Sequence, residues 1–154
     1  MSKKQKIISA VSWLLVAVCM AVIFALSHQP AAQSSELSMA VMGFVEKIFT
    51  AFVEFIGHDA FRSIAHALEY CGLALLLFNA IYQTVRNPKI ILPFLISVFY
   101  SVTDEVHQIF IEGRAFQLTD IAVDTLGSAV GIAAGYAIYK TISHFRGKKL
   151  EKKR

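Results

Sequence analysis

The residue types best suited to chemistry are concentrated between Tyr100 and Gly131, where ionisable side chains interrupt a strongly apolar sequence. They are Asp104, Glu105, His107, Asp120 and Asp124. A charged group at the centre of a bilayer costs about 2.5–3.5 kcal/mol on insertion scales, so such residues usually face a bundle interior or a water-filled cavity. They therefore mark a candidate functional site inside a helical membrane protein.

Two further groups of polar residues accompany this stretch. Arg62, His66 and Glu69 open the preceding apolar segment and, at about 100° per residue, share one face of a helix. Glu105 and His107 flank a similar face on the following segment. That face carries Ser97, Ser101, Asp104 and Gln108. At a rise of about 1.5 Å per residue, both groups and the two later aspartates lie at one depth. Three helices are therefore expected to form a common shallow polar site near one membrane surface.

Phosphoryl or head-group transfer on a phospholipid or a polyprenyl-linked substrate suits these residue types. Such chemistry needs cations for the phosphate oxygens and a base or nucleophile within hydrogen-bond reach. Arg62 and Arg114 would hold the phosphate as planar forks. His66 or His107 would act as base or nucleophile, with a neighbouring carboxylate fixing its tautomer.

A metal site is an alternative use of the same residues. The pairs His66-x-x-Glu69 and Asp104-x-x-His107 could bind a divalent metal ion, because such pairs on facing helices build metal sites in bundles. No motif in the sequence specifies a metal, so the cofactor stays open. His107 lies on the flank of its helix face and is as consistent with packing as with chemistry.

Three other interpretations compete with an enzyme. A non-enzymatic site could bind a lipid head group or a partner protein and so change the access of an antibiotic to the cell envelope. A structural network of interhelical hydrogen bonds would need only one or two such groups, fewer than this layer contains. A transport path is disfavoured because the polar residues do not continue through the membrane midplane.

Composition places these residues in a small polytopic membrane protein. The 154 residues are 56% hydrophobic and only 17% charged, with a mean hydropathy of +0.56. A soluble domain of this size is far less apolar. The net charge of +4 comes without a nucleic-acid motif, so nucleic acid is not an expected partner. Cys19 and Cys71 lie deep in apolar runs and are expected to be small buried hydrophobic residues.

Four apolar runs are long enough to cross a bilayer core of about 30 Å, which predicts an all-α integral membrane protein of a single domain. The spans are expected at residues 7–26, 62–83, 90–111 and 120–142. A cleaved signal peptide is the alternative for the first run, but this run exceeds the usual apolar core of such peptides. On the fourth span Gly127, Gly131 and Gly135 share a face with Asp120 and Asp124, and small residues let a neighbouring helix approach closely.

Residues 37–57 form a different kind of segment. Glu46, Thr50, Glu54 and His58 recur every four positions as a narrow polar stripe in an otherwise apolar run. An amphipathic helix in the membrane interface fits this pattern better than a spanning or re-entrant segment, because the charges would otherwise enter hydrocarbon. We therefore expect an interfacial helix between the first and second spans.

The distribution of Lys and Arg predicts the orientation. Twelve of the 15 lie before the first span, between the second and third, or from Lys140 to Arg154. Cytoplasmic loops are enriched in these residues. Both termini, including a basic tail at residues 143–154, are therefore expected in the cytoplasm of a bacterial cell membrane, and the polar site on its outer side.

Many of these residues form a pattern that resembles the VanZ-like family. It runs Arg62…His66…Tyr70, then Asp104-Glu105-x-x-Gln108-x-Phe110…Arg114…Asp120…Asp124-x-x-Gly127-x-x-x-Gly131, and Phe-x-x-Ser-His-Gln-Pro follows the first span. The resemblance covers nearly the whole chain. The position of Asp124 is often Asn in the family, so its charge is not expected to be required.

The resemblance implies a role at the cell envelope, because the family takes its name from a protein linked to low-level resistance to the glycopeptide teicoplanin. It also implies a likeness to helical membrane enzymes that act on lipid head groups. A membrane lipid or a polyprenyl-linked precursor is the expected partner, and protein partners stay open. The catalytic candidates are His66, Glu69, Asp104, Glu105, His107 and Asp120. The substrate-binding candidates are Arg62, Tyr70, Gln108, Arg114 and Asp124.

Overall fold

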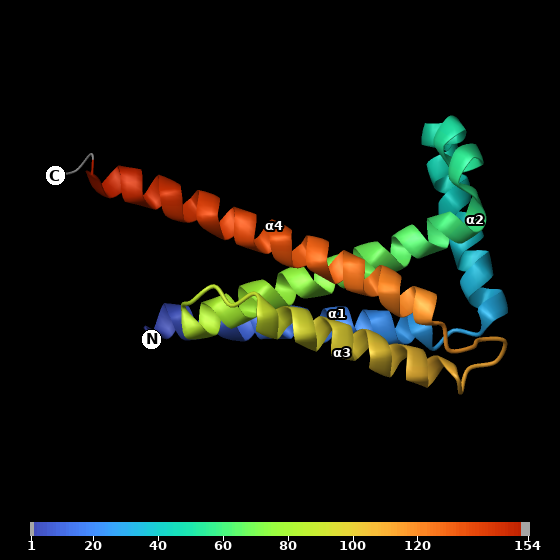
Figure 1. Ribbon diagram of the computed structural model, residues 1–154, viewed down its shortest axis with the longest axis horizontal. Coiled ribbons are helices and arrows are strands. Elements are labelled where there is room, and N and C mark those ends of the chain that lie inside the picture. Colours follow the sequence, from blue (N-terminus) through green and yellow to red (C-terminus); the bar gives the residue numbers. More distant parts are fainter. Residues whose placement is uncertain (1, 152–154) are drawn as a thin grey trace.

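Four α-helices make up the part of the chain that the structure describes, and no strand occurs among these residues. The computed structural model describes residues 2–151, without the side chains of residues 31, 33–35, 37–38, 42–59, 61, 146–147 and 149–151. The helices are α1 (Lys3–Ser27), α2 (Ala31–Val85), α3 (Ile91–Gln108) and α4 (Leu118–Glu151). Figure 1 shows the α1–α2 and α3–α4 connections together at one end, and the start of α1 and the end of α4 toward the other.

The helix ends follow local sequence signals. α1 begins with a capping box, in which Ser2 Oγ accepts the Gln5 N–H at 3.3 Å and Gln5 Oε1 accepts the Ser2 N–H at 2.8 Å. Pro30 directly precedes α2, where its missing N–H costs no helical hydrogen bond. α2 ends before Arg86, which adopts a left-handed conformation with φ of 57°.

Three helices in the described part of the chain are long and apolar enough to cross a membrane: Lys3–Ser27, Arg62–Val85 and Leu118–Phe145. They correspond to three of the four predicted spans and indicate a multi-pass membrane protein. The predicted span at residues 90–111 corresponds to α3, whose 18 residues end in a polar turn and which is not among the three. The arrangement of four spans plus an interfacial helix is therefore not confirmed, and α3 stays a predicted span.

The expected interfacial segment at residues 37–57 is the first part of α2. The helix runs from Ala31 to Val85, so this segment is not a separate element between two spans. Figure 1 shows the first part of α2, in cyan to teal, at a steep angle to the green second part. The predicted polar stripe at positions 46, 50, 54 and 58 lies outside the residues whose side chains are described, so the interfacial location stays a prediction.

The second part of α2 is the centre of the bundle and packs against the other three helices. Asn79 Nδ2 donates to Ser12 Oγ at 3.1 Å, and the Tyr100 hydroxyl donates to the Met20 carbonyl oxygen at 2.7 Å. Such interhelical bonds contribute about 0.6 kcal/mol each in membranes, so apolar packing must supply most of the stability. The core between α1 and α2 consists of Val16, Ile23, Tyr70, Leu73, Leu77 and Ala80.

Glycines on α4 set its distance from α2. A Cβ at Gly127 or Gly131 would overlap carbonyl oxygens of the α2 backbone, so these two positions form the close approach that the sequence predicts. A Cβ at Gly135 would instead lie 2.8 Å from Phe78 Cδ1, a side-chain atom. Beyond this point α4 diverges from the rest of the bundle (Figure 1).

Many large apolar residues face outward, and several polar residues are buried inside the bundle. Leu14, Phe99 and Leu126, on three different helices, are 62%, 71% and 68% exposed. The buried face of α3 carries the polar set that its spacing predicts. That set is Ser97, Ser101, Asp104 and Gln108, and Glu105 is buried with it. A surface of this kind is stable against lipid rather than water.

Candidate functional site

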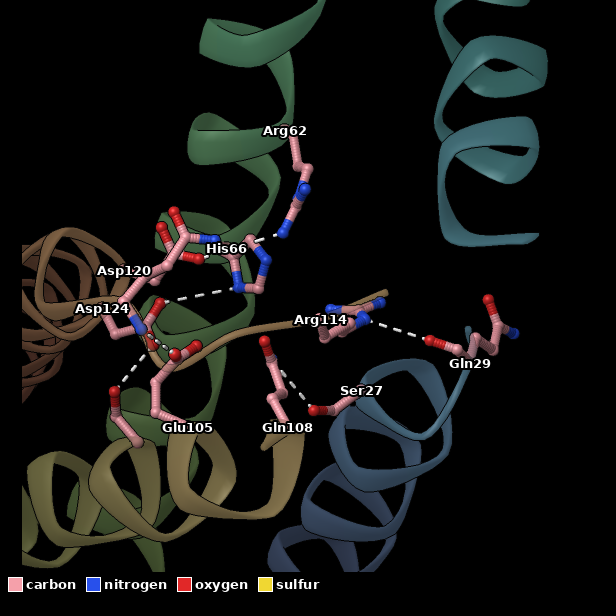
Figure 2. A network of polar contacts seen from close by, with 11 residues as sticks. Ser27, Gln29, Arg62, His66, Glu105, Gln108, Arg114, Asp120 and Asp124 are labelled. Carbon is pink, nitrogen blue, oxygen red and sulfur yellow. Dashed lines mark hydrogen bonds and ion pairs between the residues drawn. The ribbon is translucent and has the colours of Figure 1, made fainter. Parts of the chain in front are cut away.

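A cavity of about 360 Å³, here termed the cup, lies where the end of α1, both parts of α2, the end of α3 and the α3–α4 connection meet. Much of its wall is apolar and includes Ile23, Leu26, Ile64 and Leu68. Figure 2 shows Arg62 and His66 on one side and Arg114 on the other. The ionisable part of its wall consists of Arg62, His66, Glu69, Asp104 and Arg114.

Two carboxylates of α4 lie behind the α2 side of the cup. Arg62 Nη2 is 3.9 Å from Asp120 Oδ2, and His66 Nδ1 is 3.8 Å from Asp124 Oδ1. Both distances exceed hydrogen-bond length, so the carboxylates act on these groups through charge. Ser101 Oγ donates to Asp124 Oδ2 at 2.7 Å. This bond fixes the buried carboxylate from α3.

The end of α1 forms part of the site. Arg114 Nε donates to the Gln29 carbonyl oxygen at 3.0 Å, and Gln108 Nε2 donates to Ser27 Oγ at 3.1 Å. Ser27 and Gln29 also line the cavity. Neither is among the candidates predicted from the sequence, although the motif Phe-x-x-Ser-His-Gln-Pro contains both. This motif thus positions the Arg114 guanidinium in the cup wall and the Gln108 amide next to it.

Glu105 lies behind the cup rather than in its wall. It is 1% exposed, and its Oε2 accepts the Gln117 N–H at 2.8 Å. Gln117 immediately precedes α4, so this bond fastens the α3–α4 connection that carries Arg114. The structure therefore makes Glu105 a residue that positions the connection.

Replacing Glu105 by alanine should loosen this connection. The Gln117 N–H would lose a hydrogen bond to a charged acceptor, at a cost of about 1.5–3 kcal/mol. Thermal unfolding in detergent should show a lower Tm for Glu105→Ala than for the wild type. Glu105→Gln, whose amide oxygen can still accept the bond, should recover most of the loss. Equal Tm values for Glu105→Ala and the wild type would contradict this role.

His107 lies outside the cup. Its Nε2 is 3.1 Å from His28 Nδ1, and its ring centroid is 4.7 Å from that of Phe24. Both partners come from the end of α1. Within the part of the chain that the structure describes, no three His, Cys, Asp or Glu side chains are close enough to hold one metal ion. The structure therefore does not bring the four metal candidates together around one point; these are His66, Glu69, Asp104 and His107.

Several buried polar atoms around the cup have no protein hydrogen-bond partner. Buried polar groups are nearly always satisfied in proteins, so these atoms are suited to bind water or a ligand. Tyr70 is fully buried beside Glu69, with its ring 6.4 Å from that of Tyr100. The atoms are His66 Nδ1, Tyr70 Oη, Asp104 Oδ1, Gln108 Oε1 and Asp124 Oδ1.

The two guanidinium groups suit the cup to an anionic group. Burial and the neighbouring Arg62 lower the pKa of Arg114 from its usual value, whereas Asp104, Glu105 and Asp120 raise it. An arginine side chain stays protonated in proteins. An anionic group bound between Arg62 and Arg114 would relieve their repulsion and replace part of the lost hydration.

A family model described as VanZ/LLP1 matches residues 12–142, from the first half of α1 well into α4. The matched range contains every residue that lines the cup. No curated protein and no solved structure matches the chain.

Proposed function

The chain belongs to the VanZ/LLP1 family, and from this premise we propose that the cup takes the phosphate-bearing head group of a membrane lipid or lipid-linked wall precursor and performs phosphoryl or head-group transfer on it. The observation that carries this proposal is the mixed composition of the cavity wall. Two guanidinium groups, an imidazole and two carboxyl groups line the cavity together with several aliphatic side chains. Such a space fits a molecule in which phosphate adjoins hydrocarbon.

Arg62 and Arg114 bind the phosphate oxygens in this proposal. The bond from Arg114 Nε to the Gln29 carbonyl oxygen, at 3.0 Å, fixes the guanidinium plane at the cavity wall. A planar guanidinium offers parallel N–H donors that match the geometry of phosphate oxygens. The aliphatic wall, with Leu26 and Leu68, would accommodate the hydrocarbon next to the head group.

His66 is the proposed general base. Its Nδ1 lies 3.8 Å from Asp124 Oδ1, and Figure 2 shows the opposite edge of the imidazole directed toward the side where Arg114 lies. At that edge it would take the proton of an attacking hydroxyl group or water as the oxygen bonds to phosphorus. Glu69 or Asp104, in the same wall, would protonate the leaving oxygen as its bond to phosphorus breaks.

An outward-facing cup is supported by the distribution of charge. The start of α1 and the end of α4 lie away from the cup (Figure 1), and Lys and Arg are concentrated in the chain ends. By the positive-inside rule both termini would be cytoplasmic and the cup would open at the outer surface of the bacterial cell membrane. Wall precursors are accessible there, and we include in the proposal an influence on sensitivity to glycopeptides such as teicoplanin.

Turnover of a labelled substrate tests the proposal. Purified protein in lipid nanodiscs is incubated with phospholipids and polyprenyl phosphates labelled in the head group, and released or exchanged head groups are quantified. We expect turnover by the wild type and its loss in Arg62→Gln/Arg114→Gln. Absence of turnover of every labelled lipid, with unchanged lipid and wall-precursor profiles in a deletion strain, would contradict an enzymatic role.

A second candidate is a non-enzymatic site that binds the same head group, or a partner protein, and alters antibiotic access. The observation in its favour is the 3.8 Å distance between His66 and Asp124, which leaves the imidazole less firmly oriented than a hydrogen bond would.

Asp120→Asn separates the two candidates. The amide keeps the shape and the acceptor oxygen of the side chain but removes the charge beside Arg62, 3.9 Å away. A binding site should tolerate this change and retain head-group affinity. An enzyme that uses the charge to hold Arg62 in position should lose turnover while affinity changes little. Unchanged turnover would contradict a role for this charge in the reaction.

A further inference from the structure

A second cavity, of about 370 Å³ and here termed the groove, lies between α2 and α4 on the side away from the cup. Its apolar wall includes Leu75 and Phe78 of α2 and Ile138 and Ile142 of α4. Figure 1 shows α4 leaving the other helices in this region. The groove therefore opens sideways, toward the space that lipid chains occupy in a membrane.

Gly135 keeps the groove open at its deep end. Gly127 and Gly131 face the α2 backbone, whereas at Gly135 the facing atoms belong to the Phe78 and Leu75 side chains. Farther along α4, Ile138 is 52% exposed although it lines the groove. An apolar, lipid-accessible slot of this kind would be filled by a hydrocarbon chain.

The far end of the groove is aromatic, polar and basic. Tyr82 and Tyr139 pack edge to face with centroids 5.1 Å apart, as expected of residues near the membrane interface. Gln83, in the groove wall, accepts a hydrogen bond from Arg86 Nη1 at 3.1 Å. In the sequence, Arg146 and Lys149 follow the groove-lining segment of α4.

We propose that the groove binds an anionic phospholipid of the leaflet opposite the cup, with an acyl chain between α2 and α4 and its phosphate at the basic end. The apolar wall suits the chain, and the basic residues at its end are complementary to a negatively charged head group. Basic pockets between membrane helices bind anionic lipids by this combination. This site is separate from the cup and does not depend on the chemistry proposed there.

Photo-cross-linking tests the occupant. The protein is reconstituted in bilayers with equal amounts of phosphatidylglycerol and phosphatidylethanolamine that share the same acyl chains, one lipid carrying a photoreactive group in its chain. We expect phosphatidylglycerol to label peptides containing residues 75–83 and 135–143 more strongly than phosphatidylethanolamine. Equal labelling by both lipids, or cross-links between two copies of the chain at these residues, would overturn the proposal.

Charge variants beside the groove and away from it provide the matched control. Arg86→Gln removes the cation that contacts Gln83 in the groove wall, and it should lower phosphatidylglycerol labelling about fivefold. Lys140→Gln and Lys148→Gln remove the same charge from exposed positions about 140° around α4 from the groove face. They should leave groove labelling unchanged. Equal losses in both sets would show a general surface effect and overturn the site.

A size variant tests the apolar part independently. Ile138→Trp fills the groove and should strongly reduce chain labelling at residues 75–83, whereas Ala137→Trp, on the exposed opposite face of α4, should not. Circular dichroism of both variants checks that the helices are intact. Undiminished labelling in Ile138→Trp would place the acyl chain elsewhere and contradict the proposal.

Discussion

Replacing Gly131 by leucine should remove most of the folded protein. A Cβ at this position would overlap the carbonyl oxygen of Cys71, and one at Gly127 would overlap that of Ala67. Backbone atoms cannot move aside as a flexible side chain can, so α4 would have to separate from α2. The expected cost is about 3 kcal/mol or more, at the upper end for overpacking. That is a large part of a total stability of about 5–15 kcal/mol.

Gly72→Leu is the matched control, because no atom outside the local helix backbone lies within 4 Å of a Cβ built at Gly72. The same substitution there should preserve the Tm, or raise it slightly through helix propensity. Yield of monodisperse protein after detergent extraction and the Tm of each variant are measured together. Equal behaviour of the two variants would contradict the close approach of α2 and α4.

Replacing His66 by alanine should reduce head-group turnover about 100-fold or more while the protein stays folded. General acid–base groups typically contribute factors of about 10²–10⁴. The imidazole lines the cup and has the Asp124 carboxylate on its inner side, and neither feature supports α-helix packing. The measurement is kcat and KM for the labelled lipid in nanodiscs. The loss should fall mainly on kcat, because the arginines that bind phosphate remain.

His107→Ala provides the comparison within the same assay. His107 contacts His28 and Phe24 outside the cup, so its removal should leave kcat unchanged. A loss of turnover in His107→Ala as large as that in His66→Ala would contradict the assignment of His66 as the base. Equal Tm values for the wild type and both variants are required for this comparison.

Helical spacing predicted the polar faces correctly, and there is a physical reason for this success. In a lipid environment a polar residue must turn inward, so Ser97, Ser101, Asp104 and Gln108 could occupy only one side of α3, which is the side the structure buries. Depth along each helix then brought this face next to His66 and Glu69 in one cavity wall with Asp104. The spacing of Gly127 and Gly131 likewise indicated the helix contact.

Contacts between residues that are not related by helical spacing could not be predicted from the sequence. The bond between Arg114 and the Gln29 carbonyl oxygen joins two connections that are far apart in the sequence, and no spacing rule relates them. The Asp104 and His107 side chains differ by only about 60° in helical direction. That small angle is enough to direct Asp104 toward the cup and His107 toward Phe24 of α1.

The continuity of α2 was also missed. The sequence analysis separates an interfacial helix at residues 37–57 from a span at residues 62–83, but no proline lies between them, and the single glycine there, Gly57, costs a helix only about 1 kcal/mol. The helix therefore runs on from Ala31 to Val85 and changes direction without ending.

Labelling with a phospholipid that carries a photoreactive group in its head group tests most directly whether the cup holds a lipid phosphate. Wild-type protein in nanodiscs should be labelled in peptides containing residues 62–69 and 104–114, the cavity-lining segments of α2, α3 and the α3–α4 connection. Arg62→Gln/Arg114→Gln should lose this labelling about tenfold or more, since each arginine supplies charge-assisted bonds of about 1.5–3 kcal/mol. Arg86→Gln, at the other end of α2, should keep it. The account would be contradicted if the wild-type protein were not labelled at the cup, or if the double arginine variant were labelled as strongly as the wild type.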